Sequence, residues 1–205
     1  MLPQYEDLSR FIHFGQLVEH CRVLRRRFPD LGSFFADRQP LVLELGFGNG
    51  EYLVRQALAR PSENFVGLEL HWGSIRRTLR RLHRQQGSNV RLIQIDAEQA
   101  FRYFIEPGSL SELYALFPCP WPKRDHERLR LFSTAFQRLM AGAVRPGGPL
   151  RIVTDHAEFR DFILQQSVDS GLSWTLTEIE ACYQTKYERR WSGEGQQIFF
   201  QLDAQ

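Results

Sequence analysis

The chain has no apolar run long enough to span a bilayer, and its cysteines form no pattern typical of a disulfide or zinc site. Cys21, Cys119 and Cys182 lie far apart in the sequence, and no two histidines have the spacing of metal ligands. The first twenty residues carry several charges and no uninterrupted apolar segment, which argues against a secretory signal. We therefore expect a protein of the reducing cytoplasm, with neither a membrane anchor nor a metal ion.

The chain also lacks a strong net charge, because 26 basic and 24 acidic residues leave a formal charge of +2. With 205 residues, of which 42% are hydrophobic, it is long enough for one α/β domain and too short for two large ones. We expect a single domain over 1–205, with an N-terminal helical extension over 1–38 and the core over 40–205. The sequence leaves open whether the protein is a monomer or a homodimer.

The basic residues gather in two arginine clusters. The first spans Arg22 to Arg27, and the second lies in residues 72–86, where Ile75, Leu79 and Leu82 recur at helical spacing. That segment predicts an amphipathic helix with arginines on its exposed side (Arg76, Arg77, Arg80, Arg81, Arg84). One such row is typical of a solvated helical face. Two rows in a nearly neutral chain favour a phosphate-backbone partner.

Apolar runs alternate with helical patterns through most of the chain. Strands are expected in 41–46, 64–70, 90–96, 110–117 and 150–155, and helices in 51–60, 72–86, 97–105, 125–143 and 156–167. The tail differs: 173–179 and 196–202 suggest two antiparallel strands around an irregular loop, 181–195. This order predicts an α/β, Rossmann-like fold: a mostly parallel seven-stranded sheet with helices on both faces.

Ligands of such sheets bind beyond the carboxyl ends of the strands. The first of these ends is LVLELGFGNGE at 41–51, where the third glycine of a G-x-G-x-x-G fingerprint is replaced by Glu51. Together with Glu44, that acid would repel a pyrophosphate. A cationic ligand without phosphates fits better, and S-adenosylmethionine, a sulfonium compound, is one. Its adenosine would meet two further acids: Glu69 at the ribose hydroxyls and Asp96 at the adenine amino group.

The end of the fourth strand reads FPCPWPK, at 117–123. Its prolines form a stiff corner, and Trp121 offers a flat face on which a base can stack. The glycine turn and the acids Glu44, Glu69 and Asp96 in order, with RPGG before the fifth strand, predict an S-adenosylmethionine-dependent methyltransferase. Its methyl acceptor is expected at FPCPWPK.

Several phrases together resemble the bacterial tRNA (guanine-N7)-methyltransferase family over about 40–200, namely LELGFGNGEYL, FVGLEL, NVRLIQIDA, FPCPWPK, RPGG, TD in RIVTDHAEF, and TKYERR. The resemblance implies a class I methyltransferase acting on N7 of a guanine in tRNA. The expected cofactor site comprises Glu44, Gly46, Gly48, Gly50, Glu69, Leu70, Asp96, Ala97 and Cys119. The expected substrate site comprises Trp121, Lys123, Asp155, Thr185, Lys186, Tyr187 and Glu188, with Cys119 and Asp155 as the catalytic positions.

One residue departs from the family pattern FPDPWPK, because Cys119 stands where the family has a catalytic aspartate. The following basic run is also interrupted, by Asp125 and Glu127. Guanine N7 carries an in-plane lone pair and no proton, so loss of the carboxylate need not abolish methylation. A carboxylate would orient the base and stabilise the growing positive charge, which a neutral thiol does not. We expect weakened or redirected activity, with Asp155 and Glu188 accepting hydrogen bonds from the guanine edge.

Three other functions remain open at this stage. The thinner basic run would suit a free guanine-like heterocycle as acceptor. A Pro-Cys pair at this strand end is also where RNA cytosine-C5 methyltransferases carry their thiolate, so Cys119 could be a nucleophile. The third alternative is a non-catalytic protein that binds the cofactor and tRNA without turnover.

Overall fold

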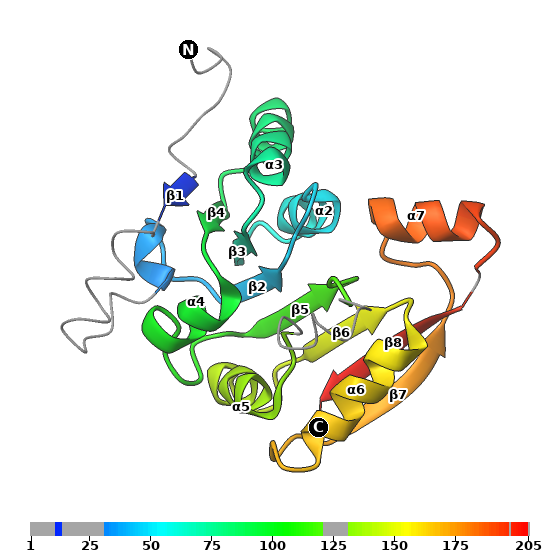
Figure 1. Cartoon of the computed structure of the whole chain (residues 1–205). Helices are drawn as coiled ribbons and strands as arrows, with labels where there is room; N and C mark the ends of the chain where they lie inside the picture. The colour runs from blue at the N-terminus through cyan, green and yellow to red at the C-terminus, as the bar shows by residue number, and fades with distance from the viewer. Residues whose placement is uncertain (1–10, 14–30, 121–130, 197, 205) are drawn as a thin grey trace.

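The computed structural model describes residues 11–13, 31–120, 131–196 and 198–204 (Figure 1). Its strands are β1 (Phe11–His13), β2 (Leu41–Leu45), β3 (Asn64–Glu69), β4 (Val90–Gln94), β5 (Glu112–Leu116), β6 (Leu150–Thr154), β7 (Trp174–Ile179) and β8 (Phe199–Ala204). Its helices are a 3₁₀ turn, η2 (Leu31–Phe34), and the α-helices α2 (Glu51–Ala59), α3 (Trp72–Gln85), α4 (Ala97–Tyr103), α5 (Thr134–Ala143), α6 (Ala157–Ser167) and α7 (Lys186–Gly193).

All these strands join one sheet in the order β1-β4-β3-β2-β5-β6-β8-β7. Strands β1 to β6 pair in parallel, and β8 runs antiparallel to both β6 and β7. The predicted mostly parallel sheet is therefore confirmed, with its five central strands and its antiparallel C-terminal pair. The short β1 adds an eighth strand beside β4.

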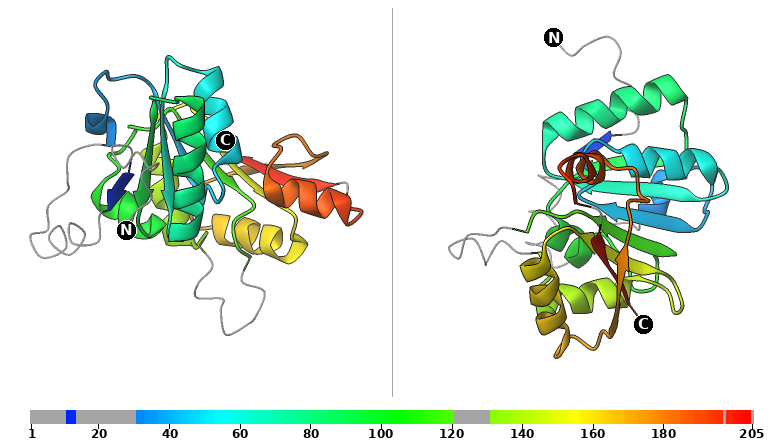
Figure 2. Two further views of the ribbon diagram at one scale, coloured as in Figure 1. Left: turned by 90° about the horizontal axis from the view of Figure 1, so that it is seen from above. Right: turned by 90° about the vertical axis from the view of Figure 1, so that its right-hand side faces the viewer.

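Helices cover both faces of the sheet, as predicted. Helices α2 and α3 pack on one face, and α4, α5 and α6 pack on the other, an arrangement that the right-hand view of Figure 2 shows clearly. In β2, alternate side chains enter opposite cores: Leu41, Leu43 and Leu45 face the α4–α6 side, whereas Val42 faces α2. The same alternation places Glu44 on the α2 side, at the carboxyl end of the strand.

The amphipathic pattern of α3 is also confirmed. Ile75, Leu79 and Leu82 are fully buried against the sheet, whereas Arg77, Arg80 and Arg84 are exposed. The first arginine cluster, Arg22 to Arg27, lies outside the described residues.

Other expectations differ from the structure in extent. Within 125–143, the described helix α5 begins only at Thr134, because the Ser133 side chain caps it by accepting from the Phe136 N–H. The loop expected at 181–195 contains the two-turn helix α7. The described part of 1–38 holds strand β1 and the turn η2, so a helical extension stays a prediction for the rest of that segment. Among the described helices, none combines the length and the apolar character that a membrane crossing requires.

Candidate functional site

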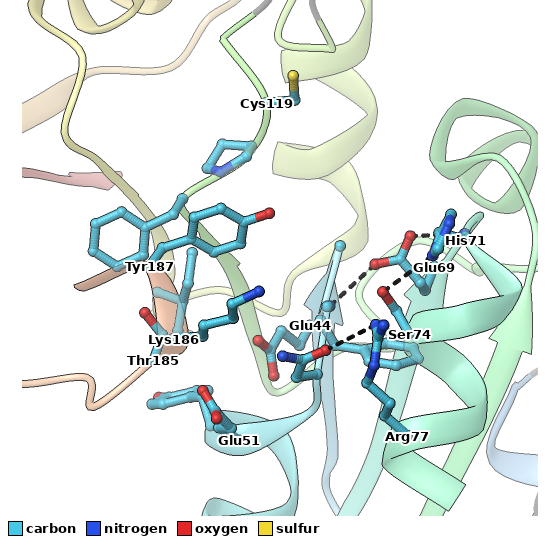
Figure 3. Close-up of a pocket in the computed structure, with 18 residues that line it drawn as sticks. Glu44, Glu51, Glu69, His71, Ser74, Arg77, Cys119, Thr185, Lys186 and Tyr187 are labelled. Atoms are coloured by element: carbon cyan, nitrogen blue, oxygen red, sulfur yellow. Dashed lines mark hydrogen bonds between the residues drawn. The ribbon is translucent and has the colours of Figure 1, made fainter. Parts of the chain in front are cut away.

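A cavity of about 450 Å³ opens at the carboxyl ends of β2, β3 and β5 (Figure 3). The glycine turn and the end of β3 form one wall, the end of β5 forms another, and the start of α7 closes it from the side. Its described lining comprises Glu44, Gly46, Phe47, Gly48, Asn49, Glu51, Tyr52, Glu69, His71, Ser74, Arg77, Leu116, Phe117, Pro118, Cys119, Thr185, Lys186 and Tyr187.

The glycine turn is hydrogen-bonded to Glu69. Its Oε2 accepts a hydrogen bond from the Gly48 N–H at 3.0 Å, and its Oε1 accepts from the N–H groups of Leu70 and His71 at 2.8 and 2.9 Å. One carboxylate thus ties the turn after β2 to the turn after β3. The two oxygens keep further lone pairs, so this placement is compatible with additional donors from a ligand.

Gly50 ends the turn and caps α2. Its φ of +65° lies in the left-handed region, and a Cβ there would come within 2.2 Å of the Thr78 side chain on α3. Only glycine satisfies both conditions, so α2 and α3 can approach closely behind the cavity.

Glu44 is the most buried acid of the cavity wall. The side chain is 3% exposed, and Oε2 has no hydrogen-bond partner among the described groups. Burial raises the pKa of this carboxyl well above its usual range; nearby Arg55 and the Leu53 N–H lower the pKa only in part, and Glu69 raises it further. A buried carboxyl oxygen without a partner, at the floor of a cavity, is suited to a cationic ligand.

The end of β5 brings Cys119 to the rim. The turn begins at Phe117, whose φ of +53° is unusual for a bulky residue and is held by packing against Phe199, with ring centroids 5.4 Å apart. Cys119 is exposed, and Figure 3 shows its sulfur directed away from Glu44 and Glu69. Trp121 and Lys123, which follow, lie outside the described residues.

The TKYE phrase builds the start of α7. Thr185 caps the helix, because its hydroxyl accepts from the Glu188 N–H at 3.1 Å. Glu188 is buried, and its Oε1 accepts from the N–H groups of Cys182 and Tyr183 at 2.7 and 2.9 Å. The capped first turn projects the half-exposed Tyr187 and Lys186 into the cavity (Figure 3).

Contacts with α2 hold this closing element in place. Arg189 donates to Glu51 Oε1 at 2.6 Å, and Arg55 donates to the Tyr183 carbonyl at 2.7 Å. The Tyr52 and Tyr183 rings pack with centroids 5.6 Å apart. Helix α7 is therefore positioned by the same helix whose N-terminus lines the cavity.

The cavity brings together many of the predicted site residues, and others lie outside its described lining. Asp96 caps α4 by accepting from the Gln99 N–H at 3.1 Å. Asp155 follows β6, and its backbone carbonyl accepts from Gln196. The remaining predicted residues outside the lining are Gly50, Leu70, Ala97 and Glu188. Contacts of all these residues with cofactor or guanine stay predictions.

Sequence reasoning missed part of the lining. Tyr52, Ser74 and Arg77 come from the first two turns of α2 and α3. Helix N-termini that follow the strands of a parallel sheet lie at the ligand edge, and this general rule could have indicated them. Within the described residues, no group of three or more histidine, cysteine or acidic side chains is arranged to hold a metal ion.

Comparisons with known proteins agree with this geometry. Residues 38–201 match the protein family described as "Putative methyltransferase". A tRNA (guanine-N(7)-)-methyltransferase of Chlorobium phaeobacteroides is 35% identical over 166 residues, which cover 81% of this chain and 81% of that protein. The chain belongs to this methyltransferase family. A relative of the same name from Thermus thermophilus is also 35% identical, over 86% of this chain, although the chain spans only 57% of its length.

Solved structures support the fold of the methyltransferase. The 16S rRNA methyltransferase KamB has a TM-score of 0.63 at 19% identity, covering 81% of this chain and 87% of that one. An antibiotic-related methyltransferase has a TM-score of 0.62 at 14% identity, covering 80% and 87%. At such identities the likeness establishes the class I, Rossmann-like methyltransferase fold and not the acceptor.

Proposed function

We propose that the protein transfers the methyl group of S-adenosylmethionine to N7 of a guanine in tRNA. The observation that carries the proposal is the cavity itself, in which the buried Glu44, with its unpartnered Oε2, faces the site from β2 while α7 and the end of β5 face it from the acceptor side. The relatives named for this reaction support the acceptor.

Glu44, Glu69 and the glycine turn would hold the cofactor. The orphaned Oε2 of Glu44 fits a cationic group, and the open backbone of Gly46 and Gly48 allows a close approach, since a Cβ on Gly46 would meet nothing within 4 Å. When bound, the cofactor supplies a methyl group on a positively charged sulfur. Glu44 and Glu69 then favour that charge electrostatically.

The start of α7 and the end of β5 would hold the guanine. Tyr187 is 50% exposed, so part of its side chain is accessible for stacking on a base, and Lys186 lies beside it. N7 needs no proton removed, so these groups act mainly by fixing the base against the methyl group. No general base is required in this scheme.

The proposal is tested by offering labelled S-adenosylmethionine with bulk tRNA, free guanosine and free guanine in parallel reactions. The products are then digested and identified by nucleoside mass spectrometry. We expect 7-methylguanosine in tRNA and none from the free compounds. Methylation of a free compound alone would favour the small-acceptor function, and 5-methylcytosine in tRNA would favour the function that uses Cys119 as a nucleophile.

A further inference from the structure

A second groove, of about 540 Å³, adjoins the methyltransferase cavity on the outer side of α2. Glu51 lines both spaces, so they meet at the N-terminus of that helix. The groove is lined from α2, α3, α7 and the loop before α7 by Glu51, Arg55, Leu58, Ala59, Arg81, Gln85, Gln184 and Arg189.

The groove has an excess of positive charge, with three guanidinium groups and one carboxylate. Glu51 is shared by two arginines, since its Oε1 lies 2.6 Å from Arg189 and 3.6 Å from Arg81. Arg55 donates to neutral oxygens, those of Gln184 and Tyr183, at 3.1 and 2.7 Å. The Arg81 and Arg189 side chains remain 33% and 57% exposed beside Glu51. After these intramolecular contacts, the guanidinium groups of the groove still have N–H donors that an anion could accept from.

Helix α3 connects the groove with the cavity. Arg77 lines the cavity, where it donates to Asn49 at 3.4 Å, and Arg81 lines the groove one turn further along the same side of the helix. The positive charge therefore extends from the mouth of the cavity into the groove. A chain of regularly spaced anions that enters the cavity at one point would follow this line.

We infer that the groove binds the phosphodiester backbone of the RNA whose guanine occupies the cavity. This inference rests on the proposed function, because the cavity fixes one nucleotide and the arginines lie where a neighbouring part of the strand would run. Guanidinium groups bind phosphates through paired N–H donors, and each such contact displaces counterions from the RNA. An acidic protein segment is the competing occupant, and the experiment below separates the two.

The test uses Arg81→Gln and Arg81→Lys in the full chain, with Arg102→Gln as a matched control. Arg102 pairs with Glu98 on the exposed side of α4, away from the residues of both spaces. The dissociation constants for tRNA, for polyglutamate and for S-adenosylmethionine are measured over a range of salt concentrations. The KM for tRNA and kcat for methylation are measured in parallel.

Arg81→Gln is expected to weaken tRNA binding and raise KM for tRNA, with kcat and cofactor affinity unchanged. For Arg81→Gln, the magnitude of the slope of log association constant for tRNA against log salt concentration should decrease by about 0.7 to 0.9, the value of one phosphate contact. Arg81→Lys and Arg102→Gln should keep the wild-type slope. If the wild type binds and methylates tRNA but Arg81→Gln keeps the wild-type slope, the inference about the groove is wrong and the proposed function still stands. Loss of polyglutamate binding with unchanged tRNA binding would also overturn it, in favour of a protein partner. Absence of tRNA binding and methylation in the wild type would overturn the proposed function itself.

Discussion

At the scale of single residues, Glu44 links stability with ligand binding. Its carboxyl is buried and has no partner for Oε2, so its ionised form is unfavourable until a cation binds nearby. Because burial raises the pKa above the ordinary value of 4.5, the folded protein holds this proton more tightly than the unfolded chain does. That contribution to stability is fully present below about pH 4.5 and is lost as the pH rises through the raised pKa.

The first prediction concerns Glu44→Gln. Since glutamine carries no titrating proton, the free energy of unfolding without ligand should exceed that of the wild type by an amount that grows with pH. Affinity for S-adenosylmethionine should fall about 10- to 100-fold, the value of a charge-assisted contact. Urea unfolding at several pH values between about 5 and 8 measures the effect on stability. Calorimetric titration measures the affinity for the cofactor. The exposed Glu178→Gln on β7 is the control, and equal cofactor affinity in the two variants would contradict the role of Glu44.

Cys119 gives the second prediction at this scale. The family resemblance predicts an aspartate at this position, so Cys119→Asp is expected to place a negative charge near the purine that becomes cationic on methylation. The rate of N7-methylation of tRNA should rise about tenfold, or roughly 1.4 kcal/mol in the barrier. Cys119→Asn, which has a similar shape and no charge, should leave the rate unchanged. An increase of less than a few-fold with Asp would show that Cys119 does not limit the reaction.

At the scale of elements, α7 depends on its own N-terminal capping. Glu188 is buried, and one of its oxygens accepts from two backbone N–H groups in the preceding loop. A contact of Glu188 with guanine is also predicted from the family resemblance. The two roles differ in their need for charge, because an amide oxygen can accept the same backbone hydrogen bonds whereas the recognition of guanine N–H groups is best served by a carboxylate.

The third prediction separates these roles. Glu188→Gln should retain the KM for tRNA within about threefold, whereas Glu188→Ala should lose about 1 to 3 kcal/mol of stability, because it leaves buried N–H groups without acceptors. Steady-state kinetics and thermal unfolding of both variants provide the measurements. If Glu188→Gln folded normally but lost activity as completely as Glu188→Ala, direct recognition of the guanine would be the correct account.

The elements also differ in how readily the sequence predicts them. The five parallel strands and α3 are long apolar or periodic patterns, so their places follow from burial alone. Helix α7 is short and polar, with Glu188 its only buried residue, and no apolar stripe marks it. Its signal is the T-x-x-E spacing of Thr185 and Glu188, the sequence signature of a capping box. In the structure, Thr185 caps the helix and the Glu188 carboxylate accepts from the N–H groups of Cys182 and Tyr183. Strand β1 has only three residues, and its pairing with β4 is a long-range contact that local pattern does not contain.

At the scale of the whole molecule, the sheet topology explains why several of the predicted site residues line one cavity. Five parallel strands end at one edge, so Glu44, Glu69 and Cys119 converge although they lie far apart in the sequence. The exact lining did not follow from the sequence. Arg77 and Ser74 contact the cavity because of how α3 is seated on α2, and Asp96 is oriented by its capping of α4. These details depend on packing between elements.

The central claim is that this methyltransferase transfers its methyl group to guanine N7 in tRNA. The most direct measurement incubates the wild type and Glu44→Gln with methyl-labelled S-adenosylmethionine and bulk tRNA, and then quantifies labelled 7-methylguanosine by mass spectrometry. The account predicts labelled 7-methylguanosine with the wild type. Below saturating cofactor, Glu44→Gln should give at least about tenfold less of this product, because the variant binds the cofactor more weakly. Label in another nucleoside, or no label in tRNA from a wild type that binds the cofactor, would contradict it.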